Sequence, residues 1–208
     1  MRNLFDFDGE YFTGGLTRVA GIDEAGRGPW AGPVVAAAVI LRPGKRIKGL
    51  NDSKKLNRQK REKLFIQITA EALAVSTGII DHEIIDEINI LAATYLAMKD
   101  AINKLTELPE LVLVDGWAIP NLGIRQHAII GGDGKSAAIA AASVIAKVTR
   151  DRIMTELACE YPLYGFENHK GYGTPEHQEA LLRFGPCALH RKSFAPVREA
   201  IERKSRAV

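Results

Sequence analysis

The unbroken apolar segment at residues 34–41 (VVAAAVIL) constrains the fold more than any other feature of this sequence. It has the length of one strand, and it lacks the alternation of apolar and polar residues that a strand with one wet face shows. A continuous apolar run is typical of a strand that is covered on both faces. The sequence therefore predicts a central β-sheet that is flanked by helices.

The segments around this strand predict an α/β fold with a central mixed sheet and a helical C-terminal part. Further strands are expected at residues 18–24, 75–80, 111–114 and 124–130, and residues 42–57 resemble an exposed loop. Helices are expected at residues 58–74, from 137 to about 160, from Pro175 until Gly185, and from Ser193 onward. Asp81 is expected to cap one long helix with an apolar face that includes Ile84, Ile88, Leu91, Tyr95, Met98 and Ile102.

Length and composition fit one compact domain. The chain has 208 residues, of which 46% are hydrophobic and 25% are charged, so it can bury a sizeable core. We expect a single domain over residues 1–208, with an N-terminal extension at 1–17 and the helical part at about 160–208. The net charge of +3 permits a polyanionic partner without requiring one.

Cysteine usage and apolar patterning indicate the compartment. Cys159 and Cys187 form no CxxC pair, so reduced thiols in a reducing compartment are expected. Acidic residues at positions 6, 8 and 10 interrupt the N-terminal segment, which therefore lacks the apolar stretch of a signal peptide. No stretch approaches the roughly 18 apolar residues of a membrane helix. A cytoplasmic protein with no membrane partner is expected.

Four carboxylates at predicted strand ends are the most informative functional feature. Asp23 and Glu24 end the first predicted strand, Asp115 follows the fourth, and Asp133 follows the fifth. Strand ends at one edge of an α/β sheet come together in space. Clustered carboxylates raise each other's pKa unless hard cations neutralise them, and oxygen ligands select Mg²⁺ or Mn²⁺. Two such ions about 4 Å apart are the usual device for phosphodiester cleavage.

Each of these acids, taken alone, also fits an ordinary turn, since Asp-Gly is a common turn dipeptide. Asp23 and Glu24 raise a geometric question as well, because neighbours on a regular strand face opposite ways. Both side chains reach one site only if the strand ends or bulges there.

Two apparent phosphate-binding motifs are rejected. The segment GGDGKS at residues 131–136 resembles a Walker A loop, but Ile129 occupies the position of that motif's first glycine. Residues 26–31 satisfy the pattern GxGxxA after a strand. However, Asp23 and Glu24 stand directly before that pattern, and the acid expected about 20 residues later is absent. Neither a nucleoside triphosphate site nor a dinucleotide site is predicted.

Several motifs, in order and over nearly the whole chain, closely resemble the signature of the ribonuclease HII family. They are AGIDEAGRGPWAGPVVAAAVIL (20–41), NDSKKL (51–56), NILAATYLAM (89–98), LVDG (113–116), AASVIAKVTRDRIM (141–154), HKGYGTPEH (169–177) and HRKSFAPV (190–197). This combination is far more specific than any single short motif. The resemblance implies a ribonuclease H-like fold and an endonuclease that cleaves the RNA strand of RNA–DNA hybrids.

The resemblance also implies incision on the 5′ side of a single ribonucleotide in duplex DNA, which leaves a 3′-hydroxyl and a 5′-phosphate. Roles in ribonucleotide excision repair and DNA replication follow from this activity. The residues that match the family's catalytic metal site are Asp23, Glu24, Asp115 and Asp133, the same acids that the strand ends single out. Two Mg²⁺ or Mn²⁺ ions are expected there during catalysis.

The resemblance assigns further residues to the substrate. Gly26, Arg27 and Gly28 match a loop with backbone groups that contact the 2′-hydroxyl, and Tyr172 matches a tyrosine that packs against the sugar at the junction. Glycines let backbone groups approach a hydroxyl closely. A site whose polar groups stay unpaired on deoxyribose discriminates strongly against it. The alternative for Tyr172 is a half-buried core tyrosine.

Polar and basic residues are candidates for contacts with the nucleic-acid backbone. They are Ser53, Lys54, Lys55, Arg58, Lys147, Arg150, Lys170, Arg191 and Lys192. The alternative for each cation is a solvated helix or loop surface. Asp151 is expected to pair with Arg150 or to cap the helix rather than to bind metal. The five histidines show no ligand spacing and are interpreted as structural or surface residues, with a phosphate contact considered for His169 alone.

Two residues depart from the family pattern. Gly131 stands where the family often has a lysine, which removes a cation near Asp133 and is expected to weaken the grip on substrate. Trp30 stands where a smaller aliphatic residue is usual, and it is expected to alter the packing behind the loop.

Two alternative functions are weighed against this interpretation. Ribonuclease HIII has a similar acid set but usually carries an extra N-terminal domain, for which the 17 residues before the first predicted strand are too few. A catalytically silent nucleic-acid-binding module is the alternative of another class, and the intact acids argue against it. A monomer is expected. The tail ERKSRAV shows no clear sliding-clamp peptide, so that interaction stays unassigned.

Overall fold

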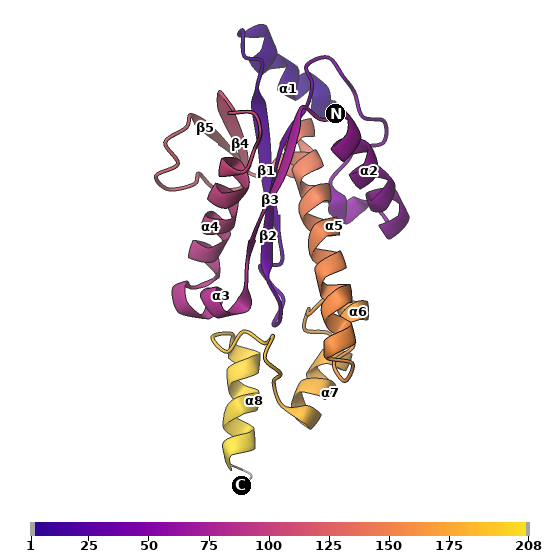
Figure 1. The fold of residues 1–208 in the computed structure, drawn as a ribbon, viewed down its shortest axis with the longest axis vertical. Coiled ribbons are helices and arrows are strands. Elements are labelled where there is room, and N and C mark those ends of the chain that lie inside the picture. The colour runs from indigo at the N-terminus through magenta and orange to yellow at the C-terminus, as the bar shows by residue number, and fades with distance from the viewer. Residues whose placement is uncertain (1–2, 207–208) are drawn as a thin grey trace.

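The computed structural model describes residues 3–206 and contains a five-stranded mixed sheet with helices on both faces (Figure 1). The strand order is β3-β2-β1-β4-β5, in which β1, β2 and β3 are antiparallel neighbours whereas β1, β4 and β5 run parallel. The strands are β1 Val19–Ala25, β2 Val34–Ile40, β3 Ala74–Ile80, β4 Leu111–Asp115 and β5 Gln126–Ile129. The predicted α/β class with a mixed sheet is confirmed.

The helices surround this sheet and continue beyond its end. They are α1 Leu4–Thr13, α2 Arg58–Glu71, α3 His82–Ile88, α4 Ile90–Asn103, α5 Ala137–Glu160, α6 Phe166–His169, α7 Pro175–Phe184 and α8 Ala195–Arg206, with 3₁₀ turns η1 Ser53–Lys55 and η2 Gly132–Gly134. The outermost residues of the predicted N-terminal extension and of the tail, 1–2 and 207–208, lie outside the described residues. Among the described residues, none of the helices combines the length and apolarity that crossing a bilayer requires.

Strand β2 shows why both faces of the sheet are covered. All seven of its residues are buried. Ala37 and Val39 belong to a core that α2 and α5 complete, whereas Ala36 and Ala38 belong to a core on the opposite face with α4. The alternation of β2 side chains between two apolar cores is the physical reason for its unbroken apolar sequence.

Two glycines let helices lie unusually close to the sheet. A Cβ atom on Gly21 in β1 would lie 2.1 Å from the carbonyl carbon of Ala138 in α5. A Cβ atom on Gly78 in β3 would lie 2.0 Å from the carbonyl oxygen of Ala97 in α4. The first ten residues of α5, 137–146, are all buried and mostly alanine, so small residues on both sides bring α5 against β1.

The long helix predicted after Asp81 is divided into α3 and α4. Asp81 caps α3 as expected, since its carboxylate accepts the Ile84 N–H at 3.0 Å. Asn89 then adopts a φ of +69°, and its side chain accepts the N–H groups of Leu91 and Ala92 at 3.0 and 3.1 Å. The prediction of one helix was wrong because the apolar spacing continues across a break that the Asn89 backbone and cap impose.

The N-terminal extension contains helix α1, which the sequence interpretation missed. Buried Asp8 joins this helix to α5 by accepting the Ala138 N–H at 2.8 Å, and its second oxygen has no hydrogen-bond partner. Burial raises the pKa of Asp8 to about 6, against the lowering effect of hydrogen bonds at the α5 N-terminus. Strand β5 is also shorter than predicted, at Gln126–Ile129.

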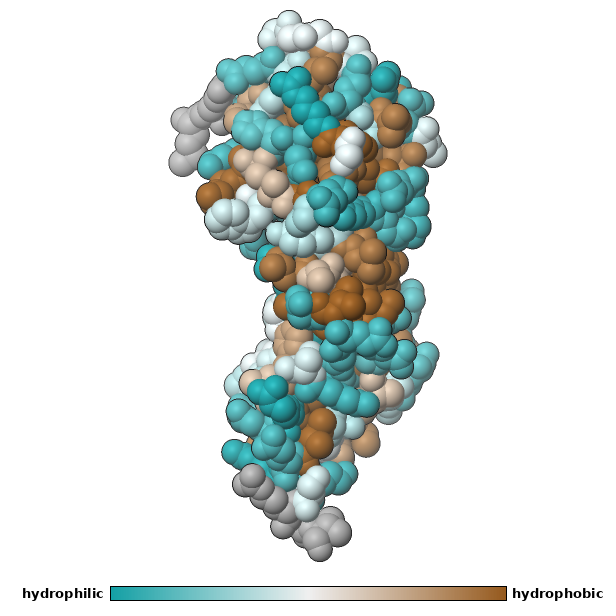
Figure 2. All heavy atoms as spheres, turned by 90° about the vertical axis from the view of Figure 1, so that its left-hand side faces the viewer, coloured by the Kyte–Doolittle hydropathy of each residue, from teal (hydrophilic) through white to brown (hydrophobic). Residues whose placement is uncertain are grey.

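The C-terminal helices lie beyond one end of the sheet, with α8 pointing away from it (Figure 1). Asp86 of α3 attaches this part, because its carboxylate accepts the N–H groups of Lys192 and Ser193 at 2.8 and 2.9 Å. Figure 2 views the molecule from the side of α4 and shows apolar atoms gathered across the middle of this face. Leu91 and Leu96 of α4 are among the exposed apolar side chains.

Candidate active site

Parallel pairing of β1 and β4 brings the first two acids together. Ile22 lies opposite Val114 in this pair, so Asp23 and Asp115 follow side by side at the same sheet edge. Asp133 comes from η2, the short turn between β5 and α5, rather than from the end of the strand itself. The Gly132 N–H donates to Asp115 Oδ1 at 2.6 Å, which ties this turn to β4.

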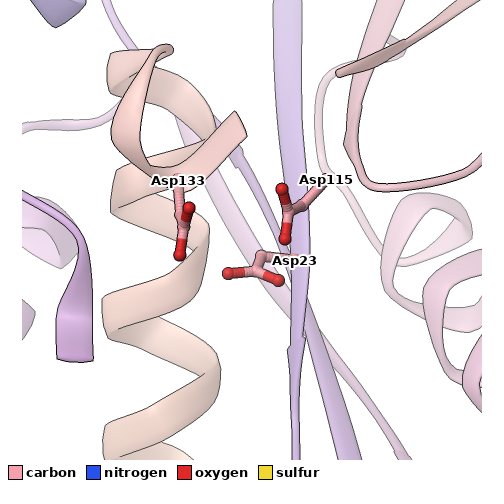
Figure 3. Close-up of side chains that lie close together, drawn as sticks. All are labelled: Asp23, Asp115 and Asp133. Carbon is pink, nitrogen blue, oxygen red and sulfur yellow. The ribbon is translucent and has the colours of Figure 1, made fainter. Parts of the chain in front are cut away.

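The three aspartates point toward one another (Figure 3). One carboxylate oxygen from each of Asp23, Asp115 and Asp133 lies within 4.8 Å of the others. We call these three residues the acid cluster. Asp23 and Asp133 are buried, with 5% and 7% of their surface exposed. All-oxygen donors at this spacing fit a hard divalent cation, and the structure thus brings together three of the four acids that the sequence singled out.

Glu24 lies beside the acid cluster without joining it. Strand β1 continues to Ala25 and does not end at the acids, so the side chains of Asp23 and Glu24 leave the strand in different directions. The Glu24 N–H donates to Asp23 Oδ1 at 2.7 Å. Its carboxylate Oε1 lies 3.3 Å from Nη1 of Arg27. Glu24 therefore faces the adjoining cleft and has a cationic partner there.

Burial and like charge shift the acidity of this region. Burial raises the pKa of Asp23 well above its usual value, and the negative charges of Glu24 and Asp115 raise it further. Burial also raises the pKa of Asp115, although the Gly132 N–H opposes this. The pKa of Glu24 is raised by burial despite the lowering effect of Arg27. A divalent cation would stabilise the ionised forms of these acids.

Lys54 supplies a positive charge next to the acid cluster. Its Nζ lies 3.4 Å from Oδ2 of Asp133. Burial lowers the pKa of Lys54, but the negative charges of Asp133 and Asp23 outweigh burial and raise it. Gly131 leaves no side chain at the position where the sequence interpretation notes a missing lysine, and it adopts a left-handed φ of +64°. The Lys54 ammonium is thus a cation close to Asp133 in this chain.

A cleft of about 210 Å³ adjoins the acid cluster. Its lining includes nine residues that the sequence assigned to the site, and these are Asp23, Glu24, Gly26, Arg27, Gly28, Ser53, Lys54, Lys147 and Tyr172. Ser143 also lines the cleft, and the sequence interpretation missed it. Its hydroxyl accepts the Ser53 N–H at 3.3 Å. The signal was present, because Ser143 precedes Lys147 by four residues and so shares its face of α5.

Two buried arginines hold the glycine loop, residues 26–33. Arg191 donates to the carbonyl oxygens of four residues, namely Gly26, Arg27, Pro29 and Gly32, at 2.7–3.1 Å. Arg150 donates to the carbonyls of Ala31, Pro33 and Lys170 at 2.9–3.1 Å. We call these two arginines the loop scaffold. A Cβ atom on Gly26 would lie 2.1 Å from Nε of Arg150, so only glycine fits there.

The prediction that Arg150 and Arg191 contact phosphates is therefore wrong. Both side chains are fully buried, and carbonyl oxygens occupy all three of their nitrogen atoms. Burial lowers the pKa of Arg150 to about 10 and that of Arg191 to about 9. The expected ion pair of Arg150 with Asp151 is also absent from the described residues, since Asp151 pairs with Lys147 at 2.8 Å instead.

Tyr172 lies at the rim of the cleft with 40% of its surface exposed. Its ring lies 5.5 Å from the Lys147 ammonium, and a Cβ atom on Gly28 would lie 3.8 Å from its Cε1. Lys170 does not line the cleft. Its side chain is largely buried, and its ammonium donates to the Glu167 carbonyl oxygen.

The histidines at residues 169, 177 and 190 are buried, which fits their interpretation as structural residues. The phosphate contact considered for His169 is wrong, because both of its ring nitrogens are engaged. Nε2 lies 2.7 Å from the Tyr164 carbonyl oxygen, and Nδ1 accepts the Gly171 N–H at 3.2 Å.

The sequence pattern of the ribonuclease HII family matches residues 20–197. The ribonuclease HII of Caldicellulosiruptor bescii is 55% identical over 192 residues, which cover 92% of this chain and 93% of that protein. The ribonuclease HII of Burkholderia mallei is 57% identical over 184 residues, which cover 88% of this chain and 86% of that protein.

Solved structures agree with this assignment. The ribonuclease H2 of Pyrococcus horikoshii matches with a TM-score of 0.75 and 29% identity, over 89% of this chain and 98% of that one. The ribonuclease HII in a complex with PCNA from Archaeoglobus fulgidus matches with a TM-score of 0.70 and 28% identity, over 84% of this chain and 93% of that one. A Bst-RNase HIII in complex with Mn²⁺ shares the fold, with a TM-score of 0.71 and 20% identity over 91% of this chain and 70% of that one.

The fold and the acidic site define a nuclease with a ribonuclease H-like fold. Within this class, the chain belongs to the ribonuclease HII family. It is a hydrolytic endonuclease, a ribonuclease H of type 2. Family membership confirms the resemblance inferred from the motifs, including the choice of ribonuclease HII over ribonuclease HIII.

Proposed function

We propose that this enzyme cleaves the RNA strand of RNA–DNA hybrids and incises duplex DNA on the 5′ side of a single ribonucleotide, leaving a 3′-hydroxyl and a 5′-phosphate. The observation that carries the proposal is the position of the acid cluster beside a cleft that the glycine loop and Tyr172 line. Phosphodiester hydrolysis would thus take place next to backbone groups that would hydrogen-bond the 2′-hydroxyl of the sugar.

Asp23, Asp115 and Asp133 would hold divalent cations, with Glu24 beside them as a fourth ligand. We infer that two Mg²⁺ or Mn²⁺ ions bind there, because carboxylates this close raise one another's pKa unless hard cations neutralise them. When bound, such ions activate a water molecule and stabilise the leaving 3′-oxygen. The three aspartates would hold these ions in place, and two of them, Asp23 and Asp133, are buried.

The glycine loop and Tyr172 would recognise the ribonucleotide. Gly26, Arg27 and Gly28 would present backbone groups to the 2′-hydroxyl, because all three residues line the cleft and glycines let a hydroxyl approach the backbone closely. Tyr172 would pack its exposed ring against the neighbouring sugar. Ser53, Lys54 and Lys147 line the same cleft and would contact phosphates.

The biological setting of the proposal follows from this substrate. An enzyme that nicks DNA at ribonucleotides would act in ribonucleotide excision repair and in DNA replication. We propose that it does so as one domain and as a monomer. The PCNA complex of the Archaeoglobus fulgidus protein raises a sliding clamp as a partner to test for this chain.

One cleavage assay tests the proposal. A labelled DNA duplex with a single ribonucleotide, an RNA–DNA hybrid and an all-DNA duplex are each incubated with the enzyme and Mg²⁺ or Mn²⁺. We expect one nick 5′ of the ribonucleotide with a product that carries a 3′-hydroxyl, fragments from the hybrid, and no cleavage of plain DNA. An intact ribonucleotide duplex with both metals, or a nick on its 3′ side, would contradict the proposal.

A further inference from the structure

Three buried histidines lie behind Tyr172, and the proposed chemistry uses none of them. His177 belongs to α7, His169 to α6, and His190 to the segment before α8. The rings are in mutual contact, since His169 stacks on His177 with 4.6 Å between ring centroids and His190 lies 5.2 Å from it. Trp30 covers His177 at a centroid distance of 5.3 Å.

Backbone hydrogen bonds fix which nitrogen carries the proton in two of these rings. The Cys187 N–H donates to Nδ1 of His190 at 3.0 Å, so His190 carries its proton on Nε2. That nitrogen lies 3.0 Å from Nε2 of His177, which must accept. His177 therefore carries its proton on Nδ1, and it donates to the Tyr172 carbonyl oxygen at 2.9 Å. We call His177 and His190 the histidine relay.

The surroundings keep both rings of the relay neutral. Burial lowers the pKa of His177 to about 4. Burial and the neighbouring His177 together lower the pKa of His190 to about 3. A proton added to His177 would set its Nε2–H against the Nε2–H of His190 across the 3.0 Å contact. A proton added to His190 would set its Nδ1–H against the Cys187 N–H at 3.0 Å. Burial also raises the pKa of Cys187, so its thiol beside His190 stays protonated. The direction of the hydrogen bonds is thus fixed.

The relay ends on the backbone of the residue that lines the cleft. The Tyr172 N–H donates to the His169 carbonyl at 3.0 Å, and its own carbonyl accepts from His177 and from the Thr174 N–H at 2.8 Å, so both sides of this residue are held. Trp30 adds a third restraint, because a Cβ atom on Gly173 would lie 2.1 Å from its indole ring. The Trp30 N–H also donates to the Gly171 carbonyl at 2.8 Å.

We propose that His177 and His190 are positioning residues, which fix the Tyr172 backbone through an ordered chain of hydrogen bonds and so hold the tyrosine ring against the sugar of the bound duplex. Trp30 seals this chain from water. The inference rests on the proposed function in one respect, since it takes the substrate to be a duplex that contacts Tyr172. Both histidines act through Tyr172 and touch neither the metal ligands nor the scissile phosphate.

Amide substitutions test the relay because asparagine and glutamine each replace one ring nitrogen. The Asn amide occupies the position of Nδ1, and the Gln amide occupies that of Nε2. His177→Asn keeps the donor to Tyr172, whereas His177→Gln removes it. At His190 the order reverses, because this ring reaches His177 through Nε2 and His190→Gln keeps that donor. We expect His177→Gln and His190→Asn to lower kcat/KM on the ribonucleotide duplex about tenfold, and the matched partner variants to stay within about threefold of wild type.

Each variant is also combined with Tyr172→Ala. If the relay acts through Tyr172, the tenfold loss disappears in this background. An equal loss with and without the tyrosine ring would overturn the inference, and so would the same ranking of Asn and Gln at both positions. Thermal unfolding of every variant identifies those whose loss of activity reflects loss of the folded state. If one pair fails to fold, the other pair still separates the outcomes.

A spectroscopic measurement keeps this inference distinct from the proposed function. Long-range ¹H–¹⁵N correlation spectra report which ring nitrogen is protonated, and we expect the Nδ1–H form for His177 and the Nε2–H form for His190. The opposite forms would overturn the relay whatever the enzyme cleaves. If the wild type makes no nick while these forms are observed, the proposed function fails, and the double-variant comparison is repeated on affinity for the ribonucleotide duplex.

Discussion

In the acid cluster, buried carboxylates face one another at close range, whereas in the loop scaffold every buried guanidinium nitrogen faces a carbonyl oxygen. Asp23 and its neighbours have raised pKa values because burial and like charge add together. Arg150 and Arg191 have lowered pKa values because of burial, yet each of their side-chain nitrogens donates to a carbonyl oxygen. Within residues 3–206 neither arginine has a carboxylate within ion-pair distance.

This difference in pairing distinguishes the acid cluster, which would bind a ligand, from the loop scaffold, which supports the glycine loop. Every side-chain nitrogen of the loop scaffold has a hydrogen-bond partner without any ligand, so its role is to fix backbone positions in the glycine loop. The acid cluster is incomplete, because its charges are balanced only in part by Lys54 and by backbone N–H groups. A region that folds with unbalanced buried charge gives up stability for a function that supplies the missing cation. The following experiments test this contrast, from the largest expected effect to the smallest.

Asp23→Asn should abolish cleavage and stabilise the metal-free protein. We expect a loss of activity on the order of 10³-fold with duplex binding retained, since one charge of the metal site is removed. In EDTA the Tm should rise, because the repulsion within the acid cluster falls. The matched control is Asp8→Asn, a carboxylate that is equally buried but lies at the α5 N-terminus. It should keep its activity, and Mn²⁺ should raise its Tm as in wild type. Retained cleavage by Asp23→Asn with saturating Mg²⁺ would disprove the assigned role.

Arg191→Lys should destabilise the protein by about 3 kcal/mol, because one ammonium cannot replace a guanidinium that reaches four carbonyl groups. Activity should fall as the glycine loop loses its support. Arg198→Lys, which changes an exposed arginine of α8, is the control and should alter stability by less than about 0.5 kcal/mol. Urea unfolding measures both changes. Equal stability of the two variants would show that the carbonyl contacts of Arg191 contribute little.

The pH dependence of stability should have opposite signs for the buried histidines and for buried Asp8. The folded-state pKa values of His177 and His190 are about 4 and about 3, below the usual 6.5. The unfolded chain therefore takes up protons first, and the histidines' contribution is lost as pH falls from 6.5 toward 4, by up to about 1.4 kcal/mol per pH unit for each group. Asp8, with its pKa raised to about 6, should instead add stability as pH falls from 6 toward 3.8.

Variants separate these opposing contributions. His177→Asn should flatten the loss of unfolding free energy between pH 6.5 and 4 relative to wild type, and Asp8→Asn should steepen it. Unfolding in urea at several pH values gives each slope. Parallel curves for wild type and His177→Asn would mean that His177 does not stay neutral in the folded protein.

Lys54→Ala should produce the smallest change, a uniform weakening of duplex binding that is independent of sequence. If Lys54 contacts a phosphate, the slope of the logarithm of affinity against the logarithm of salt concentration should decrease by about 1. Lys99→Ala on α4 is the control, since this helix covers the sheet away from the cleft. Filter binding without divalent cations measures both slopes. Identical slopes for Lys54→Ala and wild type would show that the Lys54 ammonium contacts no phosphate and pairs only with the acid cluster.

Helix and strand positions were largely predictable because they depend on residues close in sequence. The apolar segment at 34–41 defined β2, Ser136 capped α5, and Pro175 began α7 as expected. The failures arose where one backbone conformation or a distant partner decided the outcome. The left-handed Asn89 divided a helix that apolar spacing had joined, and Asp8 fixed α1 through an amide 130 residues away.

The sequence by itself determined the family, the covered sheet, and the acids that follow its strands, since these are properties of residue type and spacing. The tertiary structure alone decided that Asp133 reaches the acid cluster from a turn, that Glu24 turns to Arg27, and that Lys147 faces the cleft while Arg150 is buried behind it. The reason is that a buried polar group depends on its hydrogen-bond partners, and these come from elsewhere in the chain. For Arg191 the Gly26 carbonyl lies 165 residues away, a distance over which no local pattern carries information.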